Sequence, residues 1–600
     1  MRKGLSFAAL CCLLYSSALT AQKTLTSADT IPVNQIHTGM RGVAYTVFQG
    51  TKPEPMDVEV LGIMRNVNGP KGDIILVRLH GEKAEYTGVV AGMSGSPVYL
   101  DGKLAGALAF RIGEFSKEPI AGVTPIAEML EISALDQTPG GNSAPVEAKA
   151  VEPAVKTSSP GSVTVPGQGV QDFANYLKPI DTPLVFSGFS EDTVRRFAPQ
   201  FAAAGIVPVM GVGSHSDVKQ PEPLEPGSAV SAVLVRGDMD IAATCTVTYV
   251  DPQRLLACGH PLMQFGAIDI PMTKAQVLAT LPSPLNAFKI INTTESVGAF
   301  RQDRHTGILG EFNQEPDMIP VSLAIHSSAG TKEFHYEVLN NAKLSPVAIM
   351  ATVFNALHGV NEYGEEITYR MLGSISVAGY PDVQLQNMYA PADGGQPAAA
   401  LAATSLGDRF GRIYDNPYDV PDIKGVKLDF DLVKERRWAR LESARTDVSE
   451  ARPGDDIIVE TVLRPYRGER IVQQIPIHIP TSASRGPLRI LVSDGEALDR
   501  MRRAAPMLGN KRLGLGPTIS LLNKEHANNR VYVSLLEADP EAMVADKVMP
   551  TLPLSVMNVM DGMRGTQEMV VLGESAVNEA STGPLDYAVA GGQILTITVK

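Results

Sequence analysis

The feature that most constrains the fold is a serine between two glycines, followed by a hairpin pattern. Residues 92–97 are Gly-Met-Ser-Gly-Ser-Pro. Glycine permits the positive φ angles of a tight turn, which exposes the Ser94 hydroxyl. The following residues predict an apolar strand, a turn at Asp101 and Gly102, and an apolar return strand. This pattern favours a β-rich unit that presents a serine nucleophile.

Length and charge limit the classes of protein to consider. A chain of 600 residues is too long for one hydrophobic core, so several domains are expected. The net charge of -13 argues against a nucleic-acid partner, which would require a basic face. Beyond the N-terminal region no segment has 18 consecutive apolar residues, so the mature chain is expected to have no membrane span. The sequence does not indicate the oligomeric state.

The N-terminus has the pattern of a secretory signal peptide. Arg2 and Lys3 precede an apolar run over residues 5–15, and small residues follow up to Ala21. We therefore expect a signal peptide over residues 1–21 and export to the periplasm or the extracellular space.

Two cysteines lie outside the predicted signal, Cys245 and Cys258. In an exported protein such a pair suggests a disulfide, with two buried thiols as the alternative. Symmetric pairing across the turn at residues 251–254 would place Cys258 opposite Val247. A bulge or a shifted turn would be needed to bring the two sulfur atoms together.

Composition divides the remaining chain into three β-rich units. A serine-bearing unit is expected over residues 30–135, then a flexible Pro-, Gly- and Ser-rich linker over 136–169. A histidine-bearing unit is expected over 170–400 and a β-sandwich-like C-terminal domain over 405–600. In the second unit we expect helices over residues 191–204 and 273–281, and an irregular Ala/Gly/Pro-rich stretch over 391–403.

A serine nucleophile needs a base, and histidine is the usual one. The sequence contains ten histidines, of which His260 has the most suitable context. It ends the apolar strand Leu255–Gly259 within the segment Ala-Cys-Gly-His-Pro, which follows an Asp-Pro turn. His260 is therefore the candidate base.

These segments resemble the SpoIVB-type serine peptidases, which are chymotrypsin-like endopeptidases. That family carries the same Gly-Met-Ser-Gly-Ser-Pro loop and a Gly-His strand end. The resemblance implies two chymotrypsin-like half-barrels, with Ser94 as nucleophile and His260 as base. Here Ser94 precedes His260 by 166 residues, the reverse of the family's order, and triad geometry does not depend on chain order. No PDZ domain is recognisable, so the family's sporulation role is not transferred.

The acid of a triad is less well defined. Asp303 lies 43 residues after His260, similar to the separation in chymotrypsin-like enzymes. Its flanking arginines are equally typical of an ordinary ion pair. Asp269 and Asp73 are alternative acids, and a Ser-His dyad without an acid is also consistent with the sequence.

The resemblance also assigns the substrate site. The backbone N–H groups of Gly92 and Ser94 would form the oxyanion hole. Residues 89–91, Val-Val-Ala, would line the primary specificity pocket and favour a small or apolar substrate side chain. Ala109, Phe110 and Arg111 would pair with the substrate backbone.

The sequence contains no motif for a metal or a cofactor, and none is expected. The function predicted is that of an exported serine endopeptidase acting on a protein or peptide substrate. One alternative is an inactive peptide-binding or envelope interaction protein on the same fold. Another is a protease that cleaves its own linker.

Overall fold

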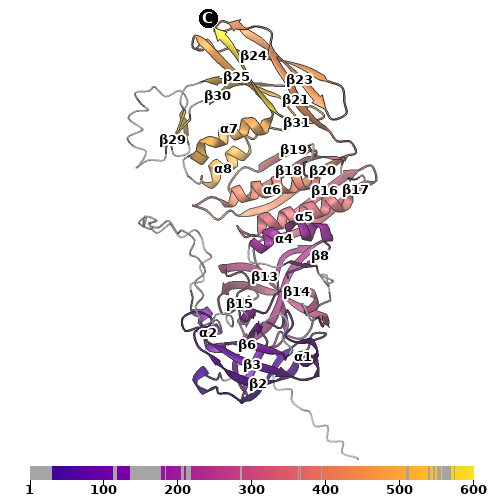
Figure 1. Ribbon diagram of the computed structural model, residues 1–600, viewed down its shortest axis with the longest axis vertical. Coiled ribbons are helices and arrows are strands. Elements are labelled where there is room, and N and C mark those ends of the chain that lie inside the picture. Colours follow the sequence, from indigo (N-terminus) through magenta and orange to yellow (C-terminus); the bar gives the residue numbers. More distant parts are fainter. Residues whose placement is uncertain are drawn as a thin grey trace, which may run out of the picture.

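The structure is a computed structural model. It describes residues 30–112, 118–135, 177–182, 184–203, 208–210, 216, 218–283, 287–361, 364, 366–392, 395–508, 513–537, 541–544, 547–549, 556, 569–572 and 575–600. The predicted signal peptide and the predicted linker lie outside these residues. The fold is mainly β, as the sequence predicts, and its parts succeed one another along a long axis (Figure 1). No described helix is long and apolar enough to cross a membrane.

The N-terminal described residues form a closed barrel of six strands, in the pairing order β4-β1-β2-β3-β6-β5 with β4 and β5 joined. Its strands are β1 (Arg41–Thr46), β2 (Glu54–Met64), β3 (Ile74–His80), β4 (Pro97–Leu100), β5 (Lys103–Ile112) and β6 (Ile120–Pro125). Alternate side chains of these strands, such as Val58, Val60 and Val77, are buried in the interior. The short helical elements are η1 (Val33–Gln35), α1 (Glu82–Thr87), α2 (Ile126–Leu130) and η2 (Glu131–Ala134).

A second closed ring of six paired strands follows, in the order β10-β13-β14-β15-β12-β11 with β10 and β11 joined. These strands are β10 (Ala229–Gly237), β11 (Asp240–Val250), β12 (Arg254–Ala257), β13 (Gly266–Leu281), β14 (Phe288–Arg304) and β15 (Gly307–Phe312). The two rings lie next to each other at one end of the molecule (Figure 1). The fold thus contains the two barrel units expected from the sequence.

The helix predicted over residues 273–281 is wrong, because these residues belong to strand β13. They pair with β14, and the register shifts at Met272/Thr273, Thr273/Ala275 and Val277/Ala279. Each shift interrupts the two-residue alternation of buried side chains by which a strand is recognised. The local pattern therefore looks helical, although pairing with a long neighbouring strand determines the structure.

The second ring continues into one large sheet of 13 strands, which also contains β8 (Leu184–Ser187), β9 (Pro208–Met210), β16 (Met318–Ser327), β17 (Gly330–Leu339), β18 (Thr368–Val377), β19 (Val383–Tyr389) and β20 (Ile423–Val433). Helices α4 (Glu191–Ala203), α5 (Ser345–Val360) and α6 (Ala398–Tyr414) pack next to it (Figure 1). The stretch over 391–403 is therefore not wholly irregular, because α6 begins at Ala398. Its alanines are buried, which allows α6 and α5 to pack closely.

The C-terminal residues form two further sheets around a shared core, with strand orders β24-β23-β21-β31 and β22-β32-β25-β26-β30. The strands are β21 (Trp438–Thr446), β22 (Glu450–Ala451), β23 (Asp456–Pro465), β24 (Ile471–His478), β25 (Gly486–Ser493), β26 (Tyr532–Glu537), β30 (Ser575–Ser581), β31 (Ala588–Ala590) and β32 (Gly592–Val599). Helices α7 (Gly495–Leu508) and α8 (Leu515–Leu522) and a small sheet of β27 (Glu541–Val544), β28 (Lys547–Met549) and β29 (Met569–Leu572) accompany them. β20 pairs with β16 and β18, so residues 423–433 belong to the large sheet.

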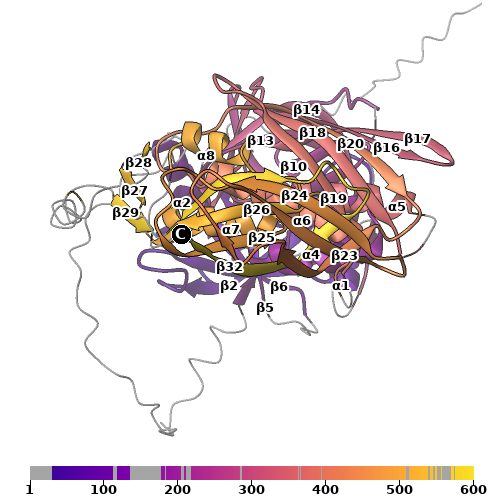
Figure 2. The same cartoon turned by 90° about the horizontal axis from the view of Figure 1, so that it is seen from above.

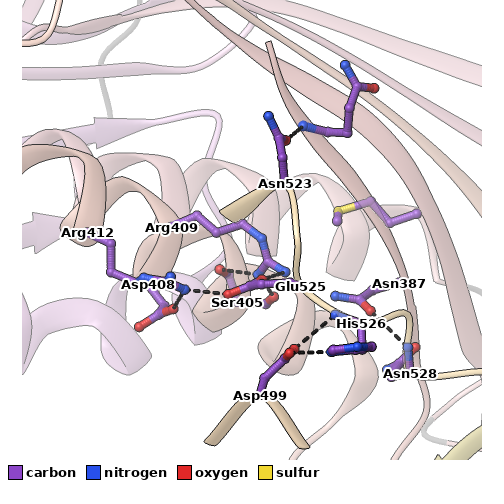
Figure 3. Close-up of polar contacts among 12 residues, drawn as sticks. Asn387, Ser405, Asp408, Arg409, Arg412, Asp499, Asn523, Glu525, His526 and Asn528 are labelled. Atoms are coloured by element: carbon purple, nitrogen blue, oxygen red, sulfur yellow. Dashed lines mark hydrogen bonds and ion pairs between the residues drawn. The ribbon is translucent and has the colours of Figure 1, made fainter. Parts of the chain in front are cut away.

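A polar junction joins this C-terminal domain to the large sheet and α6 (Figure 3). Glu525 accepts hydrogen bonds from Arg409, at 2.8 Å, and from Arg412. Asn528 bonds both backbone groups of Met388, its Oδ1 accepting from the N–H at 2.9 Å and its Nδ2 donating to the carbonyl at 2.6 Å. These contacts fix the loop after α8 against the large sheet.

Candidate active site

Ser94 lies on the loop that precedes β4 of the first barrel. Gly92 and Gly95 on either side of it have φ angles of 93° and 96°, so the glycine-dependent turn predicted from the sequence is present. Ser94 is fully buried, so the exposed hydroxyl predicted from the sequence is wrong, because the second ring covers the loop. A Cβ atom on Gly95 would lie 1.9 Å from the Thr246 carbonyl oxygen, so only glycine fits there. The loop is thus pressed directly against β11 of the second ring.

His260 follows β12 of the second ring and is also buried, with an exposed fraction of 4%. Its Nδ1 lies 2.7 Å from the carbonyl oxygen of Pro261. Its Nε2 is buried and has no hydrogen-bond partner among the residues that the structure describes. Burial lowers the pKa of His260, against opposing effects of the Pro261 and Ile180 backbone and the charge of Asp181.

Ser94 and His260 therefore lie on segments that pack together at the junction of the two barrels, and no hydrogen bond joins their side chains. The Ser94 hydroxyl donates to the carbonyl oxygen of Cys258, two residues before the histidine. The structure thus packs the serine loop against the segment that carries the histidine.

Threonine side chains fasten the two barrels together around this point. Thr246 and Thr248 of β11 donate to the carbonyls of Gly92 and Gly95, at 2.9 and 2.7 Å. From the other barrel, Thr124 donates to the carbonyl of Gly259 at 2.6 Å. The sequence analysis missed these residues. For Thr246 and Thr248 a recognisable pattern exists, because polar residues 244, 246 and 248 alternate with apolar ones and so lie on one face of the strand.

The two cysteines of the second unit are bonded to each other, with their Cα atoms 5.3 Å apart. The bulge required for this pairing is present, because the register of β11 and β12 shifts between Val247 and Tyr249. The shift places Cys258 next to Thr246, whose carbonyl accepts the Cys258 N–H at 3.2 Å. The disulfide therefore joins the two strands against which the serine loop packs.

The three aspartates considered as acids make other contacts. Asp303 accepts N–H groups of Leu262 and Met263, at 2.8 and 2.7 Å, and so shapes the loop directly after His260. Burial raises the pKa of Asp303, and these N–H groups oppose the shift. Asp269 pairs with Arg301 at 2.7 Å, and Asp73 pairs with an arginine of its own barrel. No hydrogen bond joins any of the three to His260 in the part of the chain that the structure describes.

Of the two backbone N–H groups predicted to form the oxyanion hole, those of Gly92 and Ser94, one has a hydrogen-bond acceptor in the structure and the other has none among the described residues. The Gly92 N–H donates to the carbonyl oxygen of Asp181 at 3.3 Å. The Ser94 N–H has no acceptor among the described residues. Asp181 is a residue that the sequence analysis missed, since a single polar residue after the linker carries no recognisable signal.

A buried lysine lies behind the serine loop and was also missed. Lys289 has an exposed fraction of 2%, and its Nζ lies 2.8 Å from Thr46 Oγ1 and 3.2 Å from the Gly92 carbonyl oxygen. Burial lowers the pKa of Lys289 to about 7. Its signal in the sequence is a single lysine in the apolar run 288–291, Phe-Lys-Ile-Ile.

The strand predicted to receive a substrate backbone is already paired. Phe110 and Arg111 lie opposite Pro179 and Lys178 of β7 (Leu177–Pro179), a short antiparallel strand on the edge of the first barrel. The Ala109 carbonyl accepts the N–H of Ile180 at 2.8 Å. Strand β6, which precedes the predicted linker, pairs with the other side of β5. Both sides of Phe110 and Arg111 are therefore occupied by strands of the chain itself.

Comparison with known families agrees with the resemblance expected from the serine loop. Residues 14–129 match the family model described as SpoIVB peptidase S55. The matched range contains Ser94 and the barrel strands β1–β6, whereas His260 lies outside it. No curated protein and no solved structure matches the chain. The serine-bearing part of the chain is therefore similar to a peptidase family.

Proposed function

We propose that this protein is a serine endopeptidase similar to the SpoIVB peptidases, with Ser94 as nucleophile and His260 as general base. The observation that carries the proposal is the packing of a serine loop, from the part similar to a peptidase family, against the strand end that leads to a buried histidine of the second barrel. A buried imidazole nitrogen without a partner is uncommon in folded proteins, and a role as base would account for it.

The state of the imidazole supports its role as a base. A carbonyl oxygen only accepts hydrogen bonds, so the contact with Pro261 places the ring hydrogen on Nδ1. Nε2 then carries a free lone pair, as a general base requires. In many serine hydrolases a carboxylate orients the histidine, and here the Pro261 carbonyl takes that position. Asp303 acts as a positioning residue, because it fixes the backbone of residues 262 and 263.

The reaction proceeds in two steps that share this base. After its side chain rotates away from Cys258, the Ser94 oxygen attacks the substrate carbonyl carbon and its proton passes to Nε2 of His260. The N–H groups of Ser94 and Gly92 stabilise the oxyanion. The C–N bond then breaks, and His260 returns the proton to the leaving amine. A water molecule, deprotonated by His260, hydrolyses the acyl-enzyme and regenerates the Ser94 hydroxyl.

The proposal includes export of the chain. It is supported by the signal-peptide pattern of residues 1–21 and by the disulfide between Cys245 and Cys258, because disulfides persist mainly in oxidising compartments.

Labelling with a fluorophosphonate probe tests the nucleophile and the base together. We expect the purified chain to be labelled and Ser94→Ala to remain unlabelled. The labelling rate of His260→Ala should be at least about 1,000-fold lower than that of the parent, because both residues are needed to form the reactive alkoxide. The control variants Ser133→Ala and His37→Ala lack the same chemical groups outside the site and should label like the parent. A folded parent that takes no label, even on long incubation, would favour the inactive peptide-binding protein instead.

The pH dependence of labelling provides a second prediction. Because burial lowers the pKa of His260 below its ordinary value of 6.5, the imidazole stays neutral and able to accept a proton as the pH falls below 6.5. We therefore expect the midpoint of the acid limb of the labelling rate to lie below pH 6.5. A midpoint above 6.5 would mean that a charged partner stabilises the imidazolium, and would contradict a base held only by a neutral carbonyl.

A further inference from the structure

The segment that follows the predicted linker lies along the first barrel as a bound peptide would. β7 pairs antiparallel with the end of β5, with Arg111 opposite Lys178 and Phe110 opposite Pro179. The N–H of Ile180 donates to the Ala109 carbonyl at 2.8 Å. In an antiparallel pair only every second residue exchanges backbone hydrogen bonds. Pro179, which has no N–H, occupies the position between Lys178 and Ile180.

The side chains of the segment divide into exposed and buried positions. Lys178 and Pro179 are exposed. Ile180 is buried, with an exposed fraction of 1%, and belongs to the same apolar cluster as Val90 and Met93 of the serine loop. Two of the three residues expected to line a specificity pocket, Val89 and Val90, therefore belong to the apolar cluster in which Ile180 is buried.

The next residue connects the segment to the reacting groups. The carbonyl oxygen of Asp181 accepts the N–H of Gly92 at 3.3 Å, which is one of the two donors assigned to the oxyanion hole. Its carboxylate pairs with Arg111 at 2.7 Å. The Ile180 backbone and the Asp181 charge both oppose the lowering of the His260 pKa by burial. The segment therefore contacts both the serine loop and the strand that was predicted to pair with a substrate.

We propose that residues 177–181 occupy the groove in which the peptide substrate binds, and that the enzyme is latent until this segment leaves. The inference rests on the proposed function. It also defines the class of substrate, because the segment has the form of a suitable ligand. The groove takes an extended peptide strand with a branched apolar residue, such as isoleucine, at the buried position next to the serine. Backbone pairing with Ala109 and Arg111 supplies affinity, and the apolar pocket supplies selectivity.

The covalent attachment of the segment explains how a short strand keeps the groove closed. A tethered ligand competes at a high effective concentration, so a free peptide binds only when the segment is weakened. Removing most of the Ile180 side chain takes away its buried anchor and should raise the fraction of open groove. Ile458 provides a matched control, since it is an exposed isoleucine of β23 in the C-terminal domain.

A binding experiment in the Ser94→Ala background tests the groove without catalysis. The probe is a fluorescein-labelled hexapeptide with the sequence of residues 177–182, Leu-Lys-Pro-Ile-Asp-Thr. We expect Ile180→Ala to tighten its binding, measured by anisotropy, at least about tenfold. Ile458→Ala should change it less than about twofold, within the range of ordinary surface substitutions. The same peptide with aspartate at its isoleucine should not bind, because a charge would enter the apolar pocket.

Labelling with the fluorophosphonate probe is measured in parallel on chains that keep Ser94. Ile180→Ala should label at least about tenfold faster than the parent, because the open form is more populated. If Ile180→Ala fails to fold, Asp181→Asn provides the second variant, since it removes the charge pair with Arg111 and should act in the same direction.

The two readouts separate the two proposals. Peptide binding that tightens in Ile180→Ala without labelling in any variant would support the groove and overturn the peptidase. The opposite result would be labelling that depends on Ser94, with no peptide binding and with the same labelling rate in Ile180→Ala and Asp181→Asn as in the parent. It would support the peptidase and overturn the groove.

Discussion

Replacing Gly95 with alanine is expected to abolish labelling of Ser94 and to lower the melting temperature of the barrel pair by about 10 °C or more. Gly95 has a φ of 96°, a conformation that alanine rarely adopts. An added Cβ would lie 1.9 Å from the Thr246 carbonyl oxygen and 2.6 Å from the Cys258 nitrogen. Both are backbone atoms, and the disulfide of Cys258 holds the strands that carry them together. The loop must therefore move away from the second barrel.

Gly102 provides the matched control for this prediction. It has a φ of 76° in the turn between β4 and β5, and an added Cβ would have no atom within 4 Å. Gly102→Ala should therefore cost only the backbone penalty, about 1–2 kcal/mol, and should keep the labelling. Thermal melts followed by circular dichroism compare the two variants. Equal losses in both would show that the close contact between Gly95 and β11 contributes nothing, and would contradict the described junction.

The serine loop could be predicted from the sequence because its information is local. Two glycines, a serine and a following hairpin define a turn whatever the rest of the chain does. The position of His260 could be predicted for the same reason, since a strand end after an Asp-Pro turn is a local pattern. The fold class followed from the resemblance that these two segments carry.

Features that depend on partners distant in the sequence could not be predicted. Residues 273–281 are a strand because β14 pairs with them, and bulges remove the alternation that would have identified it. Helix α5 is apolar on most faces, since it packs against α4, α6 and the sheet, and so lacks an amphipathic pattern. Spacing alone could not place Asp303 either, because its contacts are to the backbone after His260.

Replacing Lys289 with methionine is expected to stabilise the barrel pair at pH 7 and to remove a pH dependence that the parent shows. Burial lowers the pKa of Lys289 to about 7 from an ordinary value of 10.5. Its two partners, Thr46 Oγ1 and the Gly92 carbonyl, are neutral. These neutral partners offset little of the free energy that a buried ammonium group loses with its hydration. A methionine side chain fills a similar space and carries no charge.

The sign of the pH dependence follows from proton counting. Between about pH 7 and pH 10.5 the lysine of the unfolded chain holds a proton that the folded chain has released, so the free energy of unfolding increases with pH. The full shift corresponds to an increase of up to about 4–5 kcal/mol, as an upper bound. Below pH 7 both forms are protonated and the folded state has the whole penalty. Lys289→Met should lack this increase when unfolding in urea is measured at pH 7 and at pH 10.

Lys274 offers the contrasting control, because it is buried with partners that suit a charge. Its Nζ lies 3.0 Å from Glu295 and 2.7 Å from each of two backbone carbonyls. Lys274→Met should therefore destabilise the chain by about 3 kcal/mol at both pH values, since it leaves a carboxylate without its partner. Equal destabilisation by Lys289→Met, unchanged with pH, would show that Lys289 keeps its charge. If the prediction holds, the amine that contacts the Gly92 carbonyl is neutral above about pH 7. The serine loop is then held by a hydrogen bond rather than by a cation, and no positive charge next to it competes with the N–H groups for a developing oxyanion.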